Sequence, residues 1–195
     1  MELARWLLQQ GLGVVLTGGP DSDERAYAEE IARQVQVVNL VGELSLAETA
    51  ELVGRAKLFV GPDTAMTHIA AAVGVPTIAL FGPSNPVKWG PWPQDWNQPE
   101  SPWPWRGGGR QGNVQMIQGQ GDCVPCLLEG CDRHIGSSSL CLQQISTSTL
   151  IVAARAMLAD QPVRFKGVSI SLASSAQIAT KKLAAMETQG LLPKL

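Results

Sequence analysis

The segment 58–81 constrains the fold of this chain more than any other part of its sequence. An apolar run at 58–60 is followed by a small polar set and an alanine-rich stretch, and a second apolar run occupies 77–81. Two short apolar runs on either side of one helix-length stretch are typical of a βαβ unit, whose two strands are parallel. The sequence therefore predicts a parallel sheet with helices on its faces.

The same alternation of helix and strand extends toward the N-terminus. Ser45 and Glu48 have the spacing of a capping box, which marks the start of a helix. The apolar patterns predict helices and buried strands in turn, at 3–10, 13–17, 23–34, 35–40 and 45–55. This repeated order through Phe81 predicts an α/β fold with a doubly wound parallel sheet.

Small polar residues stand where the strand at 58–60 meets its helix. With about 3.6 residues per turn, Thr64, Thr67 and His68 are expected to share one face of the first helical turn, and Asp63 to face the same crevice. The first N–H groups of a helix have no partner within it and can bind an anion. The pattern predicts a site for a hydroxyl-rich, phosphate-bearing ligand, although Asp63 or Thr64 as a simple helix cap is the alternative.

Composition and charge exclude several classes of protein. Fifteen Lys and Arg residues against 17 Asp and Glu residues give a net charge of −2, so no global charge favours nucleic acid as a partner. The longest uncharged apolar stretch, 69–81, is too short to span a bilayer, and the N-terminus has no signal-peptide pattern. We expect a cytoplasmic protein without a transmembrane segment; peripheral association with a membrane stays open.

Residues 83–112 differ from the rest of the chain because they hold many prolines and glycines and five of the six tryptophans. No period of 2 or 3.6 runs through them, so we expect a long surface loop followed by a strand at 114–118. Packing of the tryptophans on the sheet edge is favoured over an aromatic platform for a sugar or a partner. The run 107–110 lacks the context of a phosphate-binding loop and is interpreted as a linker.

A cysteine-rich loop is expected at 122–141. Its four thiols belong to Cys123, Cys126, Cys131 and Cys141. A structural zinc site of four thiolates, or of three thiolates with His134, is chemically reasonable. Reduced thiols or a local disulfide are the favoured interpretation, so we expect no metal and no cofactor. A thioredoxin-like redox pair is disfavoured because no βαβ context surrounds the first two cysteines.

The C-terminal part begins with a helix predicted at 147–159, and apolar spacing predicts an amphipathic helix at about 171–189. We expect one domain at 1–160 and a tail at 161–195. The chain starts inside a helix, whereas a Rossmann-like half normally opens with a strand. Either Met1 is the true start and the sheet lacks a strand, or the chain is part of a longer protein.

Residues 58–72 and 75–86 resemble the lipopolysaccharide heptosyltransferase family, the ADP-heptose:LPS heptosyltransferases. The resemblance extends over 13–86 and resumes from 114 to about 158. It implies the two-domain GT-B architecture, of which 1–160 would be the carboxyl-terminal, donor-binding, Rossmann-like half.

The resemblance also implies roles for the polar set. Asp63 would lie near the donor sugar hydroxyls, and Thr64 and the Ala65 amide would lie against the diphosphate. Thr67 and His68 would line the same pocket. The family usually has glycine where this chain has Ala65; the extra methyl group narrows the phosphate approach but leaves the N–H donor in place.

The nucleoside end of the donor would be bound nearer the N-terminus. Asp23 or Glu24 falls near an acidic residue of the family on the nucleoside side, and Leu44 near an apolar residue beside the adenine.

The resemblance implies the donor half of an inverting glycosyltransferase that needs no metal. Its partners would be an ADP-sugar donor and a glycolipid or polysaccharide acceptor, and heptose would pass to a lipopolysaccharide-type acceptor. The general base and acceptor site belong to the family's amino-terminal domain, so no catalytic residue is assigned and we expect no turnover by this chain alone. The alternatives are a catalytically silent module that binds a partner and, less favoured, a redox or metal protein that uses the cysteines.

Overall fold

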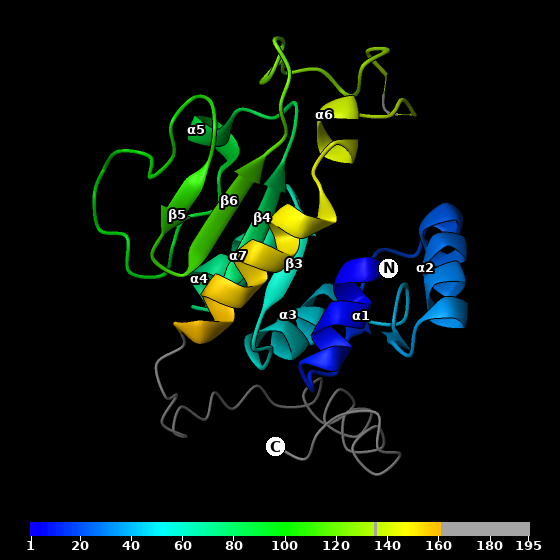
Figure 1. Ribbon diagram of the computed structural model, residues 1–195. Coiled ribbons are helices and arrows are strands. Elements are labelled where there is room, and N and C mark those ends of the chain that lie inside the picture. Colours follow the sequence, from blue (N-terminus) through cyan, green and yellow to red (C-terminus); the bar gives the residue numbers. More distant parts are fainter. Residues whose placement is uncertain (135, 161–195) are drawn as a thin grey trace. The chain divides into compact units, whose positions relative to one another are not determined.

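The computed structural model describes residues 1–134 and 136–160 (Figure 1). The predicted tail at 161–195, with its amphipathic helix, lies outside these residues. The chain divides into two compact units, one running from Met1 to Leu52 and one beginning at Val53. In the described part of the chain, no helix has the length and apolar character needed to cross a bilayer.

Unit 1 alternates helix and strand as the sequence predicts. Its elements are α1 (Glu2–Gln9), β1 (Val15–Leu16), α2 (Ser22–Gln34), β2 (Val38–Asn39) and α3 (Leu46–Gly54), the last of which continues into unit 2. β1 and β2 are parallel, with Val15 opposite Val38. Both strands are shorter than the apolar runs that predicted them.

Side-chain caps set where the helices of unit 1 begin. The Asp21 carboxylate accepts hydrogen bonds from the N–H groups of Asp23 at 2.9 Å and Glu24 at 3.3 Å, so α2 begins one residue earlier than predicted. The predicted capping box is confirmed: the Ser45 N–H donates to Glu48 Oε2 at 2.8 Å, and the Glu48 N–H donates to Ser45 Oγ at 3.3 Å.

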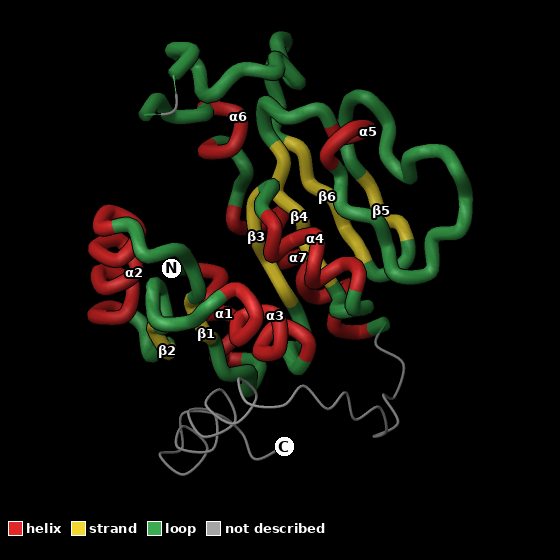
Figure 2. Tube along the Cα trace, turned by 180° about the vertical axis from the view of Figure 1, so that it is seen from behind, coloured by secondary structure: helices red, strands yellow, loops and turns green. Residues whose placement is uncertain are grey.

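Unit 2 contains a four-stranded sheet in the order β3-β4-β6-β5. Its elements are β3 (Phe59–Pro62), α4 (Ala65–Ala72), β4 (Thr77–Phe81), α5 (Pro86–Trp89), β5 (Gly109–Gln111), β6 (Val114–Gln118), α6 (Leu140–Gln143) and α7 (Thr147–Ala159). β3, β4 and β6 are parallel, which confirms the predicted βαβ unit. Figures 1 and 2 show α4 and α7 on opposite faces of this sheet.

The α/β class is confirmed, but the strands differ from the prediction in two respects. They form two sheets, β1-β2 and the four-stranded sheet, where one continuous sheet was expected. The run 107–110, interpreted as a linker, contributes to β5, which pairs antiparallel with β6. A Cβ at Gly108 would lie 2.4 Å from the Met116 carbonyl oxygen. The pairing of β5 with β6 thus depends on a close approach of the two backbones, which glycine permits. The sequence of β5 has no apolar alternation that would have predicted a strand.

One tryptophan of the 83–112 segment belongs to the core. Trp103 is 4% exposed and packs with Phe81, Val114 and Met116 of β4 and β6. Its indole N–H donates to the Pro91 carbonyl oxygen at 2.9 Å. The favoured interpretation of the tryptophans, packing against the sheet, therefore applies to this residue. Trp89, Trp92 and Trp105 are exposed.

This difference predicts that two tryptophans two residues apart contribute unequally to stability. Trp103→Phe removes a buried hydrogen bond and leaves the Pro91 carbonyl unsatisfied, so the free energy of unfolding should fall by about 1–3 kcal/mol. Trp105→Phe, at a side chain 49% exposed, should change it by less than about 0.5 kcal/mol. Urea denaturation measures both values; equal losses would contradict the assignment of Trp103 to the core.

Candidate functional site

The candidate site lies where β3 ends and α4 begins. Asp63 follows the last residue of β3, and Thr64 is the N-cap of α4 with an extended backbone. The Thr64 side chain makes no capping hydrogen bond, while its carbonyl oxygen accepts from the N–H groups of Thr67 at 3.0 Å and His68 at 3.4 Å. The first turn of α4 therefore presents N–H groups that no side chain caps, as an anion site requires.

Asp63 and His68 lie next to each other at this helix start. The distance between His68 Nε2 and Asp63 Oδ1 is 3.5 Å, and the two side chains are 40% and 24% exposed, respectively. Neither is enclosed by packed protein, so both can meet a ligand. Asp63 and His68 therefore lie side by side and border one solvent-accessible space, while their role in binding a donor stays a prediction. Thr64 and Ala65 are exposed beside them.

Thr67 does not face this space, and the prediction for it is wrong. Its side chain is fully buried, and its hydroxyl donates to the Pro62 carbonyl oxygen. Thr67, Ala70 and Ala71 are the buried residues of α4, and their i, i+3, i+4 spacing defines the face that packs on the sheet. The spacing of Thr67, Ala70 and Ala71 is the signal in the sequence that could have assigned Thr67 to the core face.

Glu24 and Asp23 at the start of α2 have different surroundings. The Gly19 N–H donates to Glu24 Oε2 at 2.7 Å, and a Cβ at Gly18 would lie 2.7 Å from the same oxygen. Glu24 therefore holds the Gly18–Gly19 turn against α2. Asp23 is exposed, and its carboxylate has no ion pair with any residue in the described ranges.

Leu44 follows a tight turn that an arginine supports. Gly42 has a φ of +71°, and Arg25 Nη2 donates to its carbonyl oxygen at 3.1 Å. The positive φ favours glycine at this turn, and a Cβ at Gly42 would lie 2.5 Å from the Arg25 guanidinium and displace it. Sequence reasoning missed Arg25, whose supporting role depends on a contact across 17 residues. Leu44 itself is half-buried.

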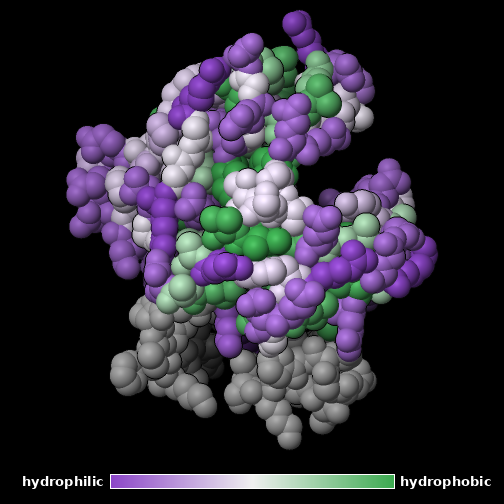
Figure 3. All heavy atoms as spheres, in the orientation of Figure 1, coloured by the Kyte–Doolittle hydropathy of each residue, from purple (hydrophilic) through white to green (hydrophobic). Residues whose placement is uncertain are grey.

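The four cysteines are free thiols, and their surroundings differ. Cys123 and Cys131 are exposed, Cys126 is half-buried and Cys141 is buried. Burial raises the pKa of the Cys141 thiol, and the nearby Cys126 and Cys131 raise it further, although a backbone hydrogen bond at Leu142 acts in the opposite direction. Leu127, which lies between Cys126 and Cys131 in the sequence, is exposed. On the face of the molecule seen in Figure 3, hydrophobic residues reach the surface among hydrophilic ones.

The structure does not assemble the metal site considered from the sequence. Among residues 1–134 and 136–160, no three His, Cys, Asp or Glu side chains come together in a way that could hold a metal ion.

The family model for glycosyltransferase family 9 (heptosyltransferase) matches residues 1–101. Lipopolysaccharide heptosyltransferase 3 of Escherichia coli is 45% identical over 86 residues, which are 43% of this chain and 25% of that protein. Lipopolysaccharide heptosyltransferase 1 of Pseudomonas aeruginosa is 39% identical over 85 residues, 44% of this chain and 24% of that protein. The chain thus spans about a quarter of the length of these relatives.

Two solved structures are similar in fold. ADP-heptose LPS heptosyltransferase II of E. coli matches with a TM-score of 0.58 and 23% identity, over 81% of this chain and 40% of that chain. A family 9 glycosyl transferase of Veillonella parvula DSM 2008 matches with a TM-score of 0.57 and 20% identity, over 82% and 40%. At these identities the likeness shows the Rossmann-like half of a GT-B fold.

The difference in cysteine environment predicts an order of modification. Because its pKa is raised, Cys141 holds less thiolate at neutral pH than an ordinary thiol, and burial also restricts access to it. Iodoacetamide should label Cys123 and Cys131 first and Cys141 last, and Cys141 should need a higher pH to react. Peptide mass spectrometry measures the rates, with urea-unfolded protein as the control. Labelling of Cys141 at the rate of Cys123 in the folded protein would contradict this order.

Proposed function

Because this chain belongs to glycosyltransferase family 9, the heptosyltransferases, we propose that it binds the donor for an inverting transfer of heptose from ADP-heptose to a lipopolysaccharide-type acceptor. One observation carries the proposal: the partly exposed Asp63–His68 pair stands beside the uncapped start of α4, within the residues that the family model matches. The proposal assigns donor binding to this chain. It assigns the general base and the acceptor site to none of its residues.

The diphosphate is the part of the donor that suits the start of α4. The Ala65 N–H and the exposed Thr64 hydroxyl are free of capping bonds and can donate to phosphate oxygens. The positive end of the helix dipole adds about 0.3–1 kcal/mol for an anion at an exposed site. The Ala65 methyl group takes space on this approach but does not remove the donor.

Asp63 and His68 suit the sugar side of the same ligand. A carboxylate repels phosphate, whereas it accepts hydrogen bonds from sugar hydroxyls, so we place Asp63 against the heptose. His68 Nε2, 3.5 Å from that carboxylate, can donate to it or to a phosphate oxygen between the two groups. In this arrangement the His68 imidazole lies between the Asp63 carboxylate and the diphosphate and reduces the repulsion between these two negatively charged groups.

The nucleoside is assigned to residues of unit 1. Asp23 or Glu24 accepts hydrogen bonds from the ribose hydroxyls, and Leu44 contacts the adenine. Glu24 is held by the Gly19 N–H through one oxygen and keeps the other available, whereas Asp23 is free to turn toward a ligand. A comparison of Asp23→Ala with Glu24→Ala in the titration below separates these two assignments.

In the proposed reaction an acceptor hydroxyl attacks the anomeric carbon of heptose from the side opposite the diphosphate. The new bond forms between that oxygen and the carbon, the bond from the carbon to the diphosphate oxygen breaks, and ADP leaves with the electron pair. Amides at the start of α4 stabilise the charge that develops on the leaving group. The acceptor is a glycolipid or polysaccharide, and the reaction belongs in the cytoplasm, where we propose that this chain acts.

Isothermal titration with ADP and with ADP-heptose tests donor binding. Asp63→Ala should weaken ADP-heptose binding about tenfold and leave ADP binding nearly unchanged, because the carboxylate faces the sugar. His68→Ala should weaken both ligands, because its imidazole serves the diphosphate as well.

Asp132→Ala and His134→Ala are matched controls, since both residues are exposed and far along the chain from α4. The absence of saturable ADP-heptose binding, or wild-type affinity for ADP-heptose in both the Asp63 and the His68 variants, would leave a catalytically silent module as the better interpretation.

A further inference from the structure

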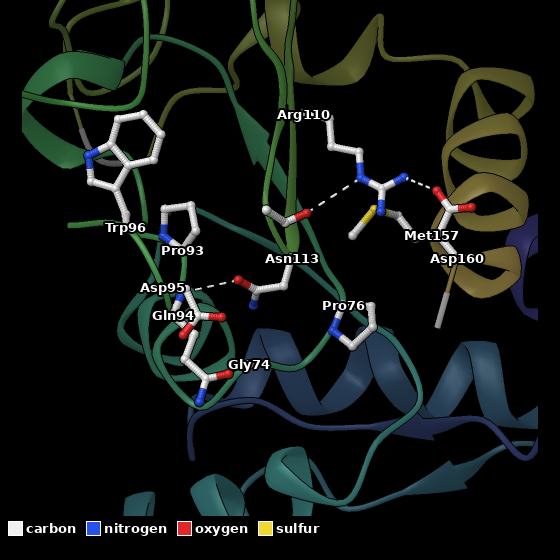
Figure 4. A pocket seen from close by; sticks show the side chains of 11 residues that line it. Gly74, Pro76, Pro93, Gln94, Asp95, Trp96, Arg110, Asn113, Met157 and Asp160 are labelled. Atoms are coloured by element: carbon white, nitrogen blue, oxygen red, sulfur yellow. Dashed lines mark hydrogen bonds and ion pairs between the residues drawn. The ribbon is translucent and has the colours of Figure 1, made fainter. Parts of the chain in front are cut away.

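A pocket of unit 2 lies at the edge of the sheet opposite the candidate donor site. Asp63 follows the carboxyl end of β3, whereas Pro76 and Asn113 immediately precede β4 and β6 and lie at the amino ends of these strands. A pocket of about 370 Å³ opens there (Figure 4). The helix α4 runs from one edge of the sheet to the other. Its eight residues rise about 1.5 Å each, so the two sites are separated by about 12 Å.

Four segments that are distant in sequence form this pocket. They are the α4–β4 turn, the segment 93–96, the β5–β6 hairpin and the C-terminal end of α7. In Figure 4 the side chains of 93–96 lie on one side of Asn113, while Arg110, Met157 and Asp160 lie on the other. The pocket therefore has two walls with Asn113 between them.

Asn113 fixes the position of the wall formed by residues 93–96. Its Nδ2 donates to the carbonyl oxygens of Ala71 and Val75, both at 2.9 Å, and its Oδ1 accepts from the Gln94 N–H at 3.1 Å. These three bonds use its amide donors and its carbonyl oxygen, so the segment 93–96 is held against the α4–β4 turn. A built pocket of this kind needs little ordering when a ligand binds.

Glycine contacts and an ion pair complete the pocket. A Cβ at Gly74 would lie 1.8 Å from Gln94 Oε1, and a Cβ at Gly112 would lie 3.2 Å from Pro93 Cβ. The Arg110 guanidinium pairs with the Asp160 carboxylate and so ties β5 to the end of α7.

The chemistry of the walls selects a neutral, hydroxyl-rich ligand. Apolar surface comes from Pro76, Pro93, Trp96 and Met157, and the Trp96 indole N–H is already used by the Glu100 carbonyl oxygen at 2.9 Å, so this side chain offers its ring alone. Flat apolar side chains suit the C–H face of a sugar ring, and a few placed polar groups bind its hydroxyls.

Charge on the two walls disfavours ions. Asp95 forms no hydrogen bond or ion pair with any residue that the structure describes, and it lines the wall opposite Arg110. The Arg110–Asp160 pair leaves its wall with little net charge, so Asp95 repels an anion, and the guanidinium across the pocket weakens the attraction of Asp95 for a cation. The hydroxyls of a neutral sugar ring can donate hydrogen bonds to the Asp95 carboxylate on one wall and accept them from the Arg110 guanidinium on the other.

We propose that this pocket binds one residue of a neutral saccharide, with its ring against the Pro93 and Trp96 wall and its hydroxyls bonded to Asp95 and Arg110. The inference goes beyond the proposed function, because neither the nucleotide nor the diphosphate takes part in it. In a glycosyltransferase such a site would hold a sugar of the acceptor chain away from the reacting centre.

Ligand-detected saturation-transfer NMR on the full chain tests the proposal. The probes are methyl α-D-mannopyranoside, methyl α-D-glucopyranoside and methyl β-D-galactopyranoside. We expect at least one to bind with a dissociation constant on the order of 1 mM, as suits a small neutral ligand with few hydrogen bonds. Asp95→Ala and Trp96→Ala should each weaken this binding about tenfold or more.

Asp132→Ala and Trp105→Ala are the matched controls, because both residues are exposed and neither lines the pocket. Asp95 is exposed, so its variant should keep the wild-type circular dichroism spectrum and unfolding transition even where Trp96→Ala does not. Asp63→Ala should leave saccharide binding unchanged, and Asp95→Ala should leave ADP binding unchanged. The proposed donor site and the proposed saccharide pocket can therefore be disproved independently of each other.

Three results would overturn the proposal. The first is no saturable binding of any of the three glycosides, and the second is binding that Asp95→Ala does not weaken. The third is displacement of the glycoside by n-butylamine at equal concentration, with loss of amine binding in Asp95→Ala, which would make the pocket a cation site.

Discussion

The packing of α4 on β3 and β4 is the constraint on which the rest of unit 2 depends. Thr67 anchors it: the side chain is fully buried, and its hydroxyl donates to the Pro62 carbonyl oxygen at the end of β3. Gly61 makes this approach possible, because a Cβ there would lie 3.1 Å from the Thr67 hydroxyl. With the helix fixed in this way, its first turn stands at the carboxyl edge of the sheet, and Asp63 and His68 remain partly exposed beside it.

The same helix connects two edges with different chemistry. At its start, uncapped amides and a carboxylate–imidazole pair suit a phosphate-bearing sugar, which agrees with membership of glycosyltransferase family 9. Beyond its end, Asn113 binds the carbonyl oxygens of Ala71 and Val75 and so supports a pocket with apolar walls and opposed charges. The proposed donor site and the proposed saccharide site therefore share one structural support but no ligand-facing residue, and each can be altered separately.

Sequence reasoning was most accurate where the signal is local. It identified β4 and α7 with their bounds, the βαβ unit and the Ser45–Glu48 capping box, because apolar periodicity and cap chemistry act over a few residues. It failed for β5, whose glycines show no alternation, and for Thr67, whose hydroxyl is compatible with either a ligand or a backbone carbonyl. The short helices α5 and α6 also escaped it, since four residues are too few to establish a period.

The sequence by itself determined the α/β class, the family and the polar set at the start of α4, because each is written in residues that are neighbours along the chain. Only the tertiary structure decided which members of that set face outward, since this depends on the face of α4 that the sheet buries. It alone also decided that Gln94, Arg110, Asn113 and Asp160 surround one pocket. Contacts between residues so far apart arise from strand pairing and helix packing, and no local pattern encodes them.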